Sequence, residues 1–351
     1  MFAHNLGIDV AGKDFQVCLK IRRPDGQVKI KGSRKFSNSI KGFESLVNWV
    51  AKKQVSDQAM RATMEATGVY YESLAYFLHE QGWQVFVLLP NRIKGYLKFL
   101  NQKSKTDKIE AEGLADLGIH QALPGWEPVS PQMYSIKKLS RERNTLIDEK
   151  TVVSNRLHAE KACKDPDRRT IKRLKQQLRL LDKQIKEVEQ DLRQHLDQDR
   201  VLKHHIDNIC QVKGLGWITV LCIIAETNGF KLVTHKSQLV SYAGYDVVER
   251  QSGSSVKGKT RISKKGNRHI RRALHFPALS VVKYQDEFTN LYHRVYDRTK
   301  IKMKGYVAVQ RKLLVLIYTL YKKNQAYDPK YVQKQQVDQT SRQGTLPAYT
   351  G

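Results

Sequence analysis

Hydrophobic and polar residues alternate with a period of two near the start of the chain. Apolar runs at residues 6–10 and 15–21 flank the turn-forming segment Ala11-Gly12-Lys13-Asp14, and a second turn at 23–26 precedes a third run at 27–30. Period-two runs separated by glycine- or proline-containing turns are typical of antiparallel strands. The pattern therefore predicts a three-stranded meander.

Helical and strand-like periods alternate after the meander. The expected elements are helices at 39–52 and 69–81 and strands at 59–65 and 84–89, the last ended by Pro90. A meander followed by alternating helices and strands is the ribonuclease H-like arrangement, in which helices flank a mixed sheet. We therefore expect an α/β domain in the N-terminal third and a mainly helical remainder.

A long helical segment, residues 133–198, follows a break at Pro124, Pro128 and Pro131. Its second half carries a seam that alternates spacings of three and four: Ile171, Leu174, Leu178, Leu181, Ile185, Val188 and Leu192. Such a seam predicts a coiled coil. Since Asp165-Pro166-Asp167 breaks the helix, we expect an antiparallel hairpin. It either packs within one chain or joins protomers, and we favour an oligomerisation arm because a long exposed hairpin has little else to pack against.

The last third contains a candidate helix-hairpin-helix element. Helical patterns at 201–209 and 217–225 flank a turn in which Lys213, Gly214 and Gly216 could approach a phosphate through backbone N–H groups. A tight turn without a ligand explains the same pattern equally well. The polar, Gln-rich tail at 324–351 is expected to be disordered.

The charge balance indicates which class of partner the protein binds. The 351 residues include 62 Lys and Arg against 34 Asp and Glu, a formal net charge of +28. This excess favours a polyanion, because neutralised phosphates release counterions. A membrane-surface protein is the alternative, but there is no run of about 20 apolar residues and no signal-peptide pattern. The four cysteines lack paired spacing for zinc or disulfides, so we expect a reduced, cytoplasmic compartment.

Three motifs each place a carboxylate where metal-dependent phosphoryl transfer would use it. Asp9 lies in the first predicted strand, and Glu65 ends a strand that can pair beside it. Asp107 and Glu110 lie three apart at the start of a helical pattern. Hard carboxylate oxygens from separate elements can hold Mg²⁺ against a phosphate. Each alone is more often a solvated turn residue, and it is their joint spacing that indicates a metal site.

A cationic loop at residues 250–272 holds nine Lys or Arg and no acid. Basic side chains with interspersed glycines suit a phosphate-backbone groove. The candidate contacts are Lys257, Lys259, Arg261, Lys264, Lys265, Arg268, Arg271 and Arg272. Ser252 could be a nucleophile here, because nearby cations lower the cost of charge on Oγ. The loop itself does not distinguish it from Ser254 or Ser255.

As a set, these motifs resemble one family. Gly7-Ile8-Asp9, Met64-Glu65-Ala66-Thr67-Gly68, Lys105-Thr106-Asp107-Lys108-Ile109-Glu110-Ala111, Tyr242-Ala243-Gly244, Gln251-Ser252-Gly253 and Ile262-Ser263-Lys264-Lys265-Gly266-Asn267 occur in family order. They are similar to the DEDD-type insertion-sequence transposases, the bridge-RNA-guided recombinases related to the Piv DNA invertase. The resemblance implies a RuvC-like domain at 1–128, a coiled-coil arm at 129–199 and a C-terminal transposase domain at 200–323.

The resemblance also implies roles for single residues. Asp9, Glu65, Asp107 and Glu110 would ligate Mg²⁺, with Mn²⁺ as a substitute. Ser252 would take the 5′ side of the cut strand as a phosphoserine. The fourth carboxylate is normally Asp in the family, and here it is Glu110, whose longer side chain can still ligate.

The implied partners are a structured noncoding guide RNA, target and donor double-stranded DNA, and further copies of the chain, as a dimer that becomes a tetramer on DNA. A prokaryotic, nucleoid-associated protein is expected. Two alternatives stay open. One is a RuvC-like junction-resolving nuclease, in which the carboxylates activate water. The other is a non-catalytic RNA-binding scaffold.

Overall fold

The computed structural model describes residues 3–53, 60–249, 251–252, 256–258 and 260–329. The chain divides into two compact units, unit 1 at Met1–Pro128 and unit 2 at Val129–Gly351. Most of the tail that was expected to be disordered, residues 330–351, lies outside the described residues. Within the described part, no helix is both long and apolar enough to cross a membrane.

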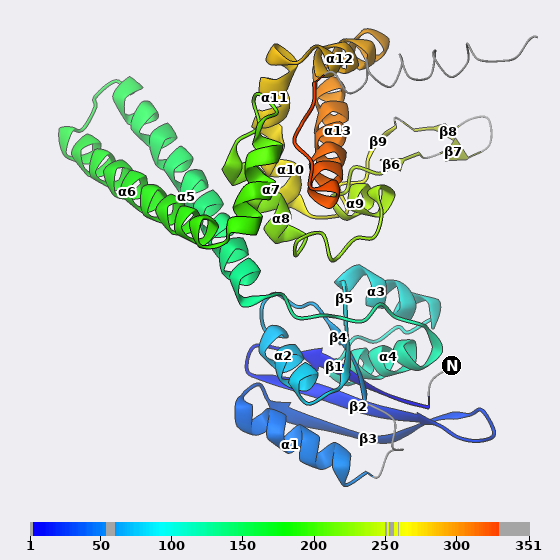
Figure 1. Cartoon of the computed structure of the whole chain (residues 1–351). Helices are drawn as coiled ribbons and strands as arrows, with labels where there is room; N and C mark the ends of the chain where they lie inside the picture. The colour runs from blue at the N-terminus through cyan, green and yellow to red at the C-terminus, as the bar shows by residue number, and fades with distance from the viewer. Residues whose placement is uncertain (1–2, 54–59, 250, 253–255, 259, 330–351) are drawn as a thin grey trace, which may run out of the picture. The chain divides into compact units, whose positions relative to one another are not determined.

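Unit 1 is built on a five-stranded mixed sheet (Figure 1). The strands are β1 (His4–Val10), β2 (Asp14–Arg22), β3 (Val28–Ser37), β4 (Arg61–Glu65) and β5 (Gln84–Leu88), in the order β3-β2-β1-β4-β5. The central strand, β1, is antiparallel to β2 and parallel to β4. This mixed α/β arrangement is compatible with the expected ribonuclease H-like fold.

Four helices cover the two faces of this sheet: α1 (Ile40–Ala51), α2 (Glu72–Glu80), α3 (Pro90–Phe99) and α4 (Asp107–His120). Because side chains alternate along a strand, Leu6 and Ile8 of β1 point into one core, which also contains Phe43 of α1. Gly7 points to the other face, where α4 packs. The central strand is therefore buried on both sides, and its end is held between two layers.

Two elements differ from the sequence prediction. Pro90 was expected only to end a strand, but it is also the first residue of α3, where a missing N–H costs nothing. Strand β3 continues to Ser37, well beyond the predicted 27–30, although its added residues are mostly polar. It is an edge strand that pairs with β2 along its length, so backbone pairing defines it rather than an apolar face.

Gly7 allows an unusually close approach of α4 to β1. A Cβ at this position would lie 2.0 Å from the Ala111 carbonyl oxygen and 2.2 Å from the Ala115 nitrogen. Both are backbone atoms, so only a shift of the helix could relieve the overlap. The glycine before Ile8-Asp9 thus fixes the position of the helix that carries Asp107 and Glu110.

We expect Gly7→Ala to lower the free energy of unfolding by about 2 kcal/mol, the cost of forcing a methyl group into a packed interface. The matched control is Gly95→Ala in α3, where an added Cβ meets nothing within 4 Å. That change should be neutral or raise stability by up to about 1 kcal/mol, because alanine favours helix. Urea unfolding measures both, and equal stabilities for the two variants would contradict the close approach.

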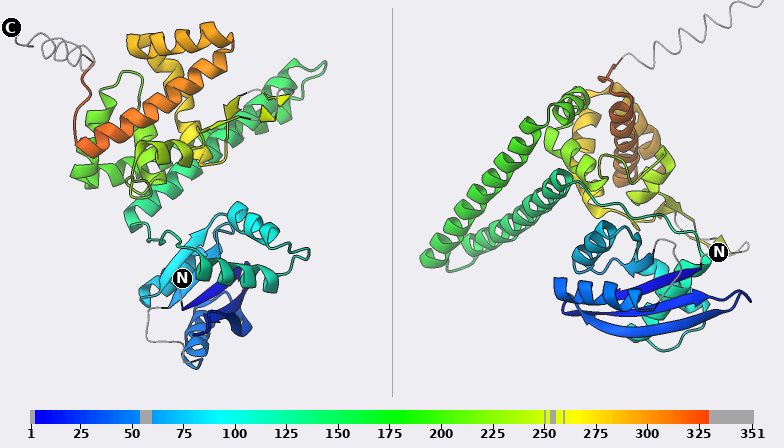
Figure 2. Two further views of the ribbon diagram at one scale, coloured as in Figure 1. Left: turned by 90° about the vertical axis from the view of Figure 1, so that its right-hand side faces the viewer. Right: turned by 60° about the horizontal axis from the view of Figure 1, so that its bottom comes forward.

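Unit 2 begins with two long helices, α5 (Pro131–Ala162) and α6 (Arg168–Gln198), which run antiparallel side by side (Figure 2). Asp167, at the predicted break, caps α6 by accepting from the backbone N–H groups of Arg169 and Thr170. The seam of α6 is covered: Leu174 is 4% and Leu181 8% exposed. These side chains are already buried within one chain, so the favoured role as an oligomerisation arm would need a different face and stays a prediction.

The rest of unit 2 is mainly helical, with two short two-stranded ribbons. The helices are α7 (Arg200–Cys210), α8 (Trp217–Glu226), α9 (Lys236–Tyr242), α10 (Arg268–Ala273), α11 (His275–Tyr284), α12 (Asp286–Thr299) and α13 (Lys302–Lys323). The strands are β6 (Val247–Val248), β7 (Gln251–Ser252), β8 (Val256–Lys257) and β9 (Arg261–Ile262). Helices α7 and α8 flank the turn with Gly214, whose φ is 97°. The phosphate-binding role of this turn stays a prediction.

Candidate functional site

Asp9 and Glu65 lie at one edge of the sheet in unit 1. Strands β1 and β4 are parallel neighbours, and Ile8 pairs with Met64, so the next residue on each strand is one of these acids. Because parallel strands end at the same edge of the sheet, Asp9 and Glu65, which are 56 positions apart in the sequence, become neighbours. Both side chains are half-buried.

Helix α4 presents the other two acids from its first turn. The Thr106 side chain caps the helix and accepts from the Ile109 N–H at 3.3 Å. Asp107 is the first helical residue and is exposed, whereas the Glu110 side chain is only 12% exposed. The cap and the close contact at Gly7 together set where these two carboxylates lie.

Burial and the charges of neighbouring acids raise the pKa values of Asp9 and Glu65. Burial, followed by the charges of Glu110, Asp107 and Glu65, raises the pKa of Asp9 from 3.8 to about 6. Burial, followed by the charge of Glu110, also raises the pKa of Glu65. Charged carboxylates held near each other repel, which favours the protonated form. A cation would relieve that repulsion.

The donor set suits Mg²⁺ by its chemistry, since it consists of hard carboxylate oxygens that carry excess negative charge. Within the described ranges, however, no three Asp, Glu, His or Cys side chains are arranged closely enough to form a finished metal site. Glu110 instead pairs with Lys105, with 3.4 Å between Oε1 and Nζ. The acids thus fit a divalent cation by charge, and Glu110 would have to exchange Lys105 for it.

Two lysines beside these acids were not among the predicted site residues. The charges of Lys94 and Lys105 oppose the rise in the pKa of Glu65, and Lys105 also opposes that of Asp9. Lys105 lies within one of the motifs already quoted, so its position was available from the sequence. Lys94 lies in α3, a helix that the hydrophobic pattern did not reveal.

Ser252 belongs to unit 2, not to the unit that holds the carboxylates. Its backbone pairs with Val256 across the ribbon of β7 and β8. The side chain of Ser252 is outside the described part of the structure, as are residues 253–255, which include Ser254 and Ser255. The choice of Ser252 as nucleophile therefore remains a proposal.

A buried acid anchors the segment on which Ser252 is carried. Glu226, at the end of α8, is 1% exposed and accepts from Arg141 at 2.7 and 2.9 Å and from Asn267 Nδ2 at 2.7 Å. The Tyr242 hydroxyl donates to the Glu226 carbonyl oxygen at 3.0 Å. Tyr242 and Asn267 lie on either side of the ribbons, so Glu226 ties both ends of this segment to α5 and α8.

Gly266 lets the two motifs around the ribbons pack together. A Cβ there would lie 2.5 Å from the Tyr242 carbonyl oxygen and 2.6 Å from the Gly244 nitrogen. The Asn267 N–H also donates to the Tyr242 carbonyl oxygen at 2.7 Å. The Tyr-Ala-Gly and Ser-Lys-Lys-Gly-Asn motifs are thus two halves of one closure at the base of the ribbons.

The predicted nucleic-acid contacts fall into three groups. Exposed ones are Lys213, Gly214, Gly216, Arg261, Lys264, Lys265 and Arg268. Two are engaged within the protein: Arg271 donates to the Ala243 carbonyl oxygen at 2.7 Å, and Arg272 pairs with Asp148 at 2.7 Å. The side chain of Lys257 and the whole of Lys259 lie outside the described residues.

Two family models match the chain in sequence order. One, described as a transposase of the DEDD IS110 type, matches residues 6–160 and so includes all four acids. The other, described as the transposase IS116/IS110/IS902 family, matches residues 206–293 and so includes Ser252 and the basic loop.

Named relatives align over most of the chain. The pilin gene-inverting proteins of Moraxella bovis and Moraxella lacunata are 28% and 27% identical, over 92% of this chain and 97% of each relative. A transposase for insertion sequence element IS1328 from Yersinia enterocolitica is 23% identical over 57% of this chain and 65% of its own length. With both models matched in order and these relatives aligned alongside, the chain belongs to the IS110-type family of DEDD transposases.

Proposed function

We propose that this transposase cuts and exchanges DNA strands of an insertion sequence under the guidance of an RNA, through a covalent phosphoserine intermediate. The observation that carries the proposal is the placement of Asp9, Glu65, Asp107 and Glu110 on three elements of unit 1, near enough that, in addition to burial, the charges of the other acids raise the pKa of Asp9 and the charge of Glu110 raises that of Glu65. Membership of a transposase family and the basic serine-bearing loop support the same chemistry.

The carboxylates would hold Mg²⁺, or Mn²⁺ in its place. When bound, this ion supplies Lewis-acid stabilisation of charge on the scissile phosphate. Asp9 and Glu65 would hold it from the sheet edge, and Asp107 and Glu110 would hold it from α4. Lys105, which pairs with Glu110 in this structure, would be placed to neutralise charge on the phosphate.

Ser252 would act as the nucleophile. Its Oγ–P bond forms as the bond from phosphorus to the 3′ oxygen breaks, the hydroxyl proton leaves, and the 3′ oxygen is released as a hydroxyl. The 3′-OH of the partner strand then attacks the phosphoserine, which forms the new phosphodiester and returns the serine hydroxyl. No net hydrolysis occurs, because the phosphodiester energy is kept in the serine ester.

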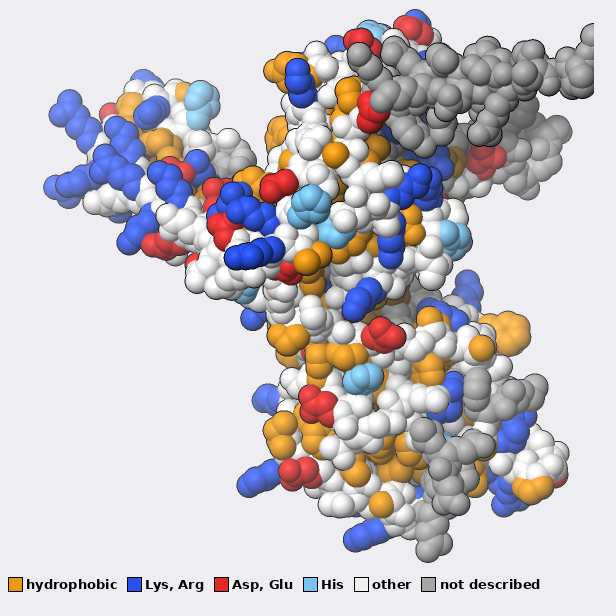
Figure 3. Space-filling view, viewed as in Figure 1, with side chains coloured by type: hydrophobic (Ala, Val, Ile, Leu, Met, Phe, Trp, Pro, Cys, Tyr) orange, Lys and Arg blue, Asp and Glu red, His pale blue; other side chains and the backbone are white. Residues whose placement is uncertain are grey.

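The nucleic-acid partners would be a structured guide RNA and target and donor DNA, with base pairing carrying sequence specificity. A large basic surface supports this. Residues 168–181 of α6 contain no acid, and Lys and Arg side chains gather over the hairpin in Figure 3. The basic residues there are Arg168, Arg169, Lys172, Arg173, Lys175 and Arg179.

The domain division proposed from sequence assigns residues 1–128 to the carboxylates, 129–199 to the arm, 200–323 to the serine and 324–351 to a tail. Because the acids and Ser252 belong to separate units, one protomer could supply the serine to another in a dimer or tetramer. An arm that joins protomers would use outer side chains such as Val152 and Leu180, which are 57% and 55% exposed.

Strand exchange separates this function from its alternatives. With DNA carrying the element's junctions, RNA from its flanking noncoding segment, and Mg²⁺, the wild type should join strands without releasing hydrolysed ends. Ser252→Ala should abolish joining, while Ser254→Ala and Ser255→Ala keep it. A Ser252→Ala protein that cuts at the normal rate would indicate a junction-resolving nuclease, and a wild type that binds both nucleic acids without cutting would indicate a scaffold.

A further inference from the structure

A lysine-lined pocket of about 680 Å³ opens between the end of α3 and the start of α4 in unit 1. Lys94 and Lys98 of α3 line it, together with Lys105 and Glu110 from the segment that starts α4. None of these lysines belongs to the basic loop of unit 2. The pocket is therefore a second cationic surface, separate in sequence from the predicted nucleic-acid contacts.

The pocket adjoins the carboxylates directly. Glu110 lines it and is one of the four acids, and its Oε1 lies 3.4 Å from Lys105 Nζ. The pocket thus combines one acid with several lysines, among uncharged residues such as Leu97 and Asn101. A phosphodiester strand whose cut phosphate reached the metal would pass its neighbouring phosphates along such lysines.

An aromatic side chain stands beside the lysines. Phe99, next to Lys98 at the end of α3, is 79% exposed. Its ring stacks on Tyr96, with centroids 6.4 Å apart and planes at 28°. Phe99 does not line the pocket itself but directly follows Lys98, which does. Exposed rings that accompany a cationic groove are the surfaces on which bases of single-stranded nucleic acids stack. The outer face of Phe99 is therefore available to a base.

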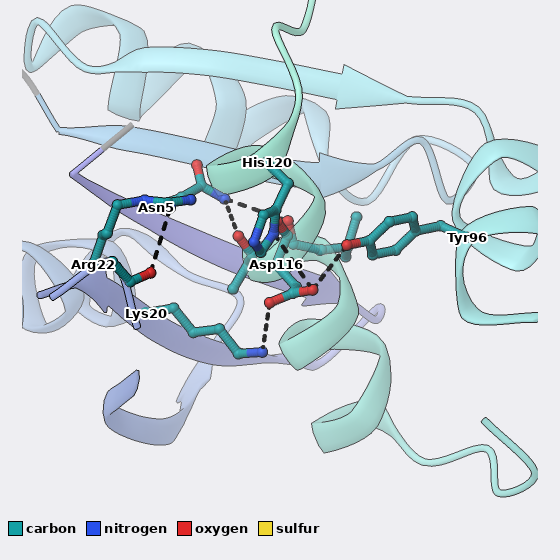
Figure 4. Close-up of polar contacts among 9 residues, drawn as sticks. Asn5, Lys20, Arg22, Tyr96, Asp116 and His120 are labelled. Carbon is teal, nitrogen blue, oxygen red and sulfur yellow. Dashed lines mark hydrogen bonds and ion pairs between the residues drawn. The ribbon is translucent and has the colours of Figure 1, made fainter. Parts of the chain in front are cut away.

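The stacked pair of Tyr96 and Phe99 is held in place by hydrogen bonds to other elements of unit 1. The Tyr96 hydroxyl donates to Asp116 Oδ2 at 2.8 Å, and Lys20 of β2 donates to Asp116 Oδ1 at 3.0 Å. Figure 4 shows Lys20, Tyr96 and His120 directed at the Asp116 carboxylate. Because Asp116 lies in α4, this network ties α3 to both the sheet and the helix that carries Glu110.

We propose that this pocket holds one single strand of DNA next to the cut position, with phosphates on Lys94 and Lys98 and a base on Phe99. The inference rests on the proposed function, since it assumes that a strand reaches the carboxylates. Charge complementarity and the exposed ring select a single strand, because a base inside a duplex has no free face to stack.

Phe99→Trp in the full chain makes the platform visible. A thymidine oligonucleotide of about 12 residues, within the usual site size for such surfaces, is added in EDTA so that no cutting occurs. Stacking should quench the fluorescence added by the new tryptophan by more than half. The control is Ile40→Trp, another exposed position, on α1 (Ile40 is 60% exposed), whose added fluorescence should not change.

A charge test uses the same Phe99→Trp variant. Adding Lys94→Gln and Lys98→Gln should reduce the slope of log affinity against log salt, read from the quenching of the introduced tryptophan, by about 1.4, or about 0.7 for each phosphate lost from a single strand. The matched pair Lys29→Gln and Lys41→Gln, exposed lysines of β3 and α1, removes equal charge and should leave the slope unchanged.

The outcomes separate this inference from the proposed function. Unchanged fluorescence of Phe99→Trp at saturating oligonucleotide, with binding followed by anisotropy, would overturn the inference even if Ser252-dependent exchange occurs. Quenching by a uridine RNA oligonucleotide but not by the DNA would also overturn it and make RNA the occupant. Quenching in a protein that never exchanges strands would instead support single-strand binding at this surface and contradict the proposed function.

Discussion

Asp9→Asn is expected to lower the rate of strand cleavage by about 1,000-fold, or about 4 kcal/mol of transition-state stabilisation, as the loss of a ligand to a catalytic metal typically requires. Asp9 lies at the end of the central strand, and the charges of the three other acids act on it. The substitution keeps the size of the side chain and removes its charge. Binding of RNA and DNA should change little, because one charge is a small part of a net +28.

The control for this effect is Asp14→Asn in the same unit. Asp14 pairs with Lys35 at 3.0 Å on a largely exposed surface. Its loss should leave cleavage within about twofold of the wild type, since exposed ion pairs contribute little. Quenched-flow or gel measurement of the cut strand gives both rates. Near wild-type cleavage by Asp9→Asn would remove Asp9 from the site.

Stability in EDTA distinguishes a lost ligand from a damaged fold. The pKa of Asp9 in the folded chain is raised to about 6, so its favourable contribution is present below about pH 4 and is lost as the pH rises through 6. Asp9→Asn removes the charge that destabilises the metal-free protein at pH 7.5. The variant should therefore unfold at higher urea than the wild type at pH 7.5 and at similar urea at pH 4, and Mg²⁺ should stabilise only the wild type.

Glu226→Ala is expected to have the largest effect on stability, lowering the free energy of unfolding by about 3 kcal/mol, because removing one partner of a buried ion pair leaves the others unsatisfied. Burial works to raise the pKa of Glu226, but the hydrogen bonds and charge of Arg141, together with the hydrogen bond from Asn267 and the charge of Lys137, lower that pKa below its ordinary value. The carboxylate is thus a charged, fully bonded group inside unit 2. The estimate lies at the low end of the usual range because the Arg141 side chain is 44% exposed and can return to water.

Circular dichroism during urea unfolding measures this change, since unit 2 is mainly helical. The matched control is Glu187→Ala, which removes a carboxylate 3.7 Å from Lys183 on an exposed surface of α6. It should shift the transition far less. If the two variants unfold alike, Glu226 is not the anchor of the serine-bearing segment that its hydrogen bonds indicate.

The sheet of unit 1 could be predicted from the sequence because local residue patterns identify most of its strands. Apolar runs with turn residues between them predict hairpins, and a strand followed by a helix predicts a parallel neighbour. The meeting of Asp9 and Glu65 then follows from β1 and β4 being parallel and adjacent. Here a local pattern was enough to place two acids at one edge.

Helix α3 could not be recognised in the same way. Of its ten residues only Ile93 is fully buried, and Gly95 in the middle weakens a helical pattern. Its position depends on Tyr96 donating to Asp116, which also accepts from Lys20, and both partners come from elsewhere in the chain. Lys94 and Lys98 of the pocket and the exposed Phe99 were therefore missed along with the helix.

Glu226 was missed for a related reason. It is the only acid between Asp207 and Asp246, at the end of an apolar helix, which is a weak sign of a buried charge. Its role as a buried anchor depends on the ion pair with Arg141, which lies 85 positions earlier in the sequence. The selection of Ser252 is different again, since it came from family resemblance and not from any physical property of the loop.

The central claim is tested most directly by trapping the covalent intermediate. Wild-type protein, guide RNA, Mg²⁺ and DNA labelled on the 5′-phosphate side of the cut should give a protein–DNA adduct that survives denaturant, and mass spectrometry should locate the nucleotide on the peptide that contains Ser252. The adduct should be absent in Ser252→Ala and in Asp9→Asn. Cut DNA with no adduct in the wild type, or an adduct on any other residue, would contradict the account.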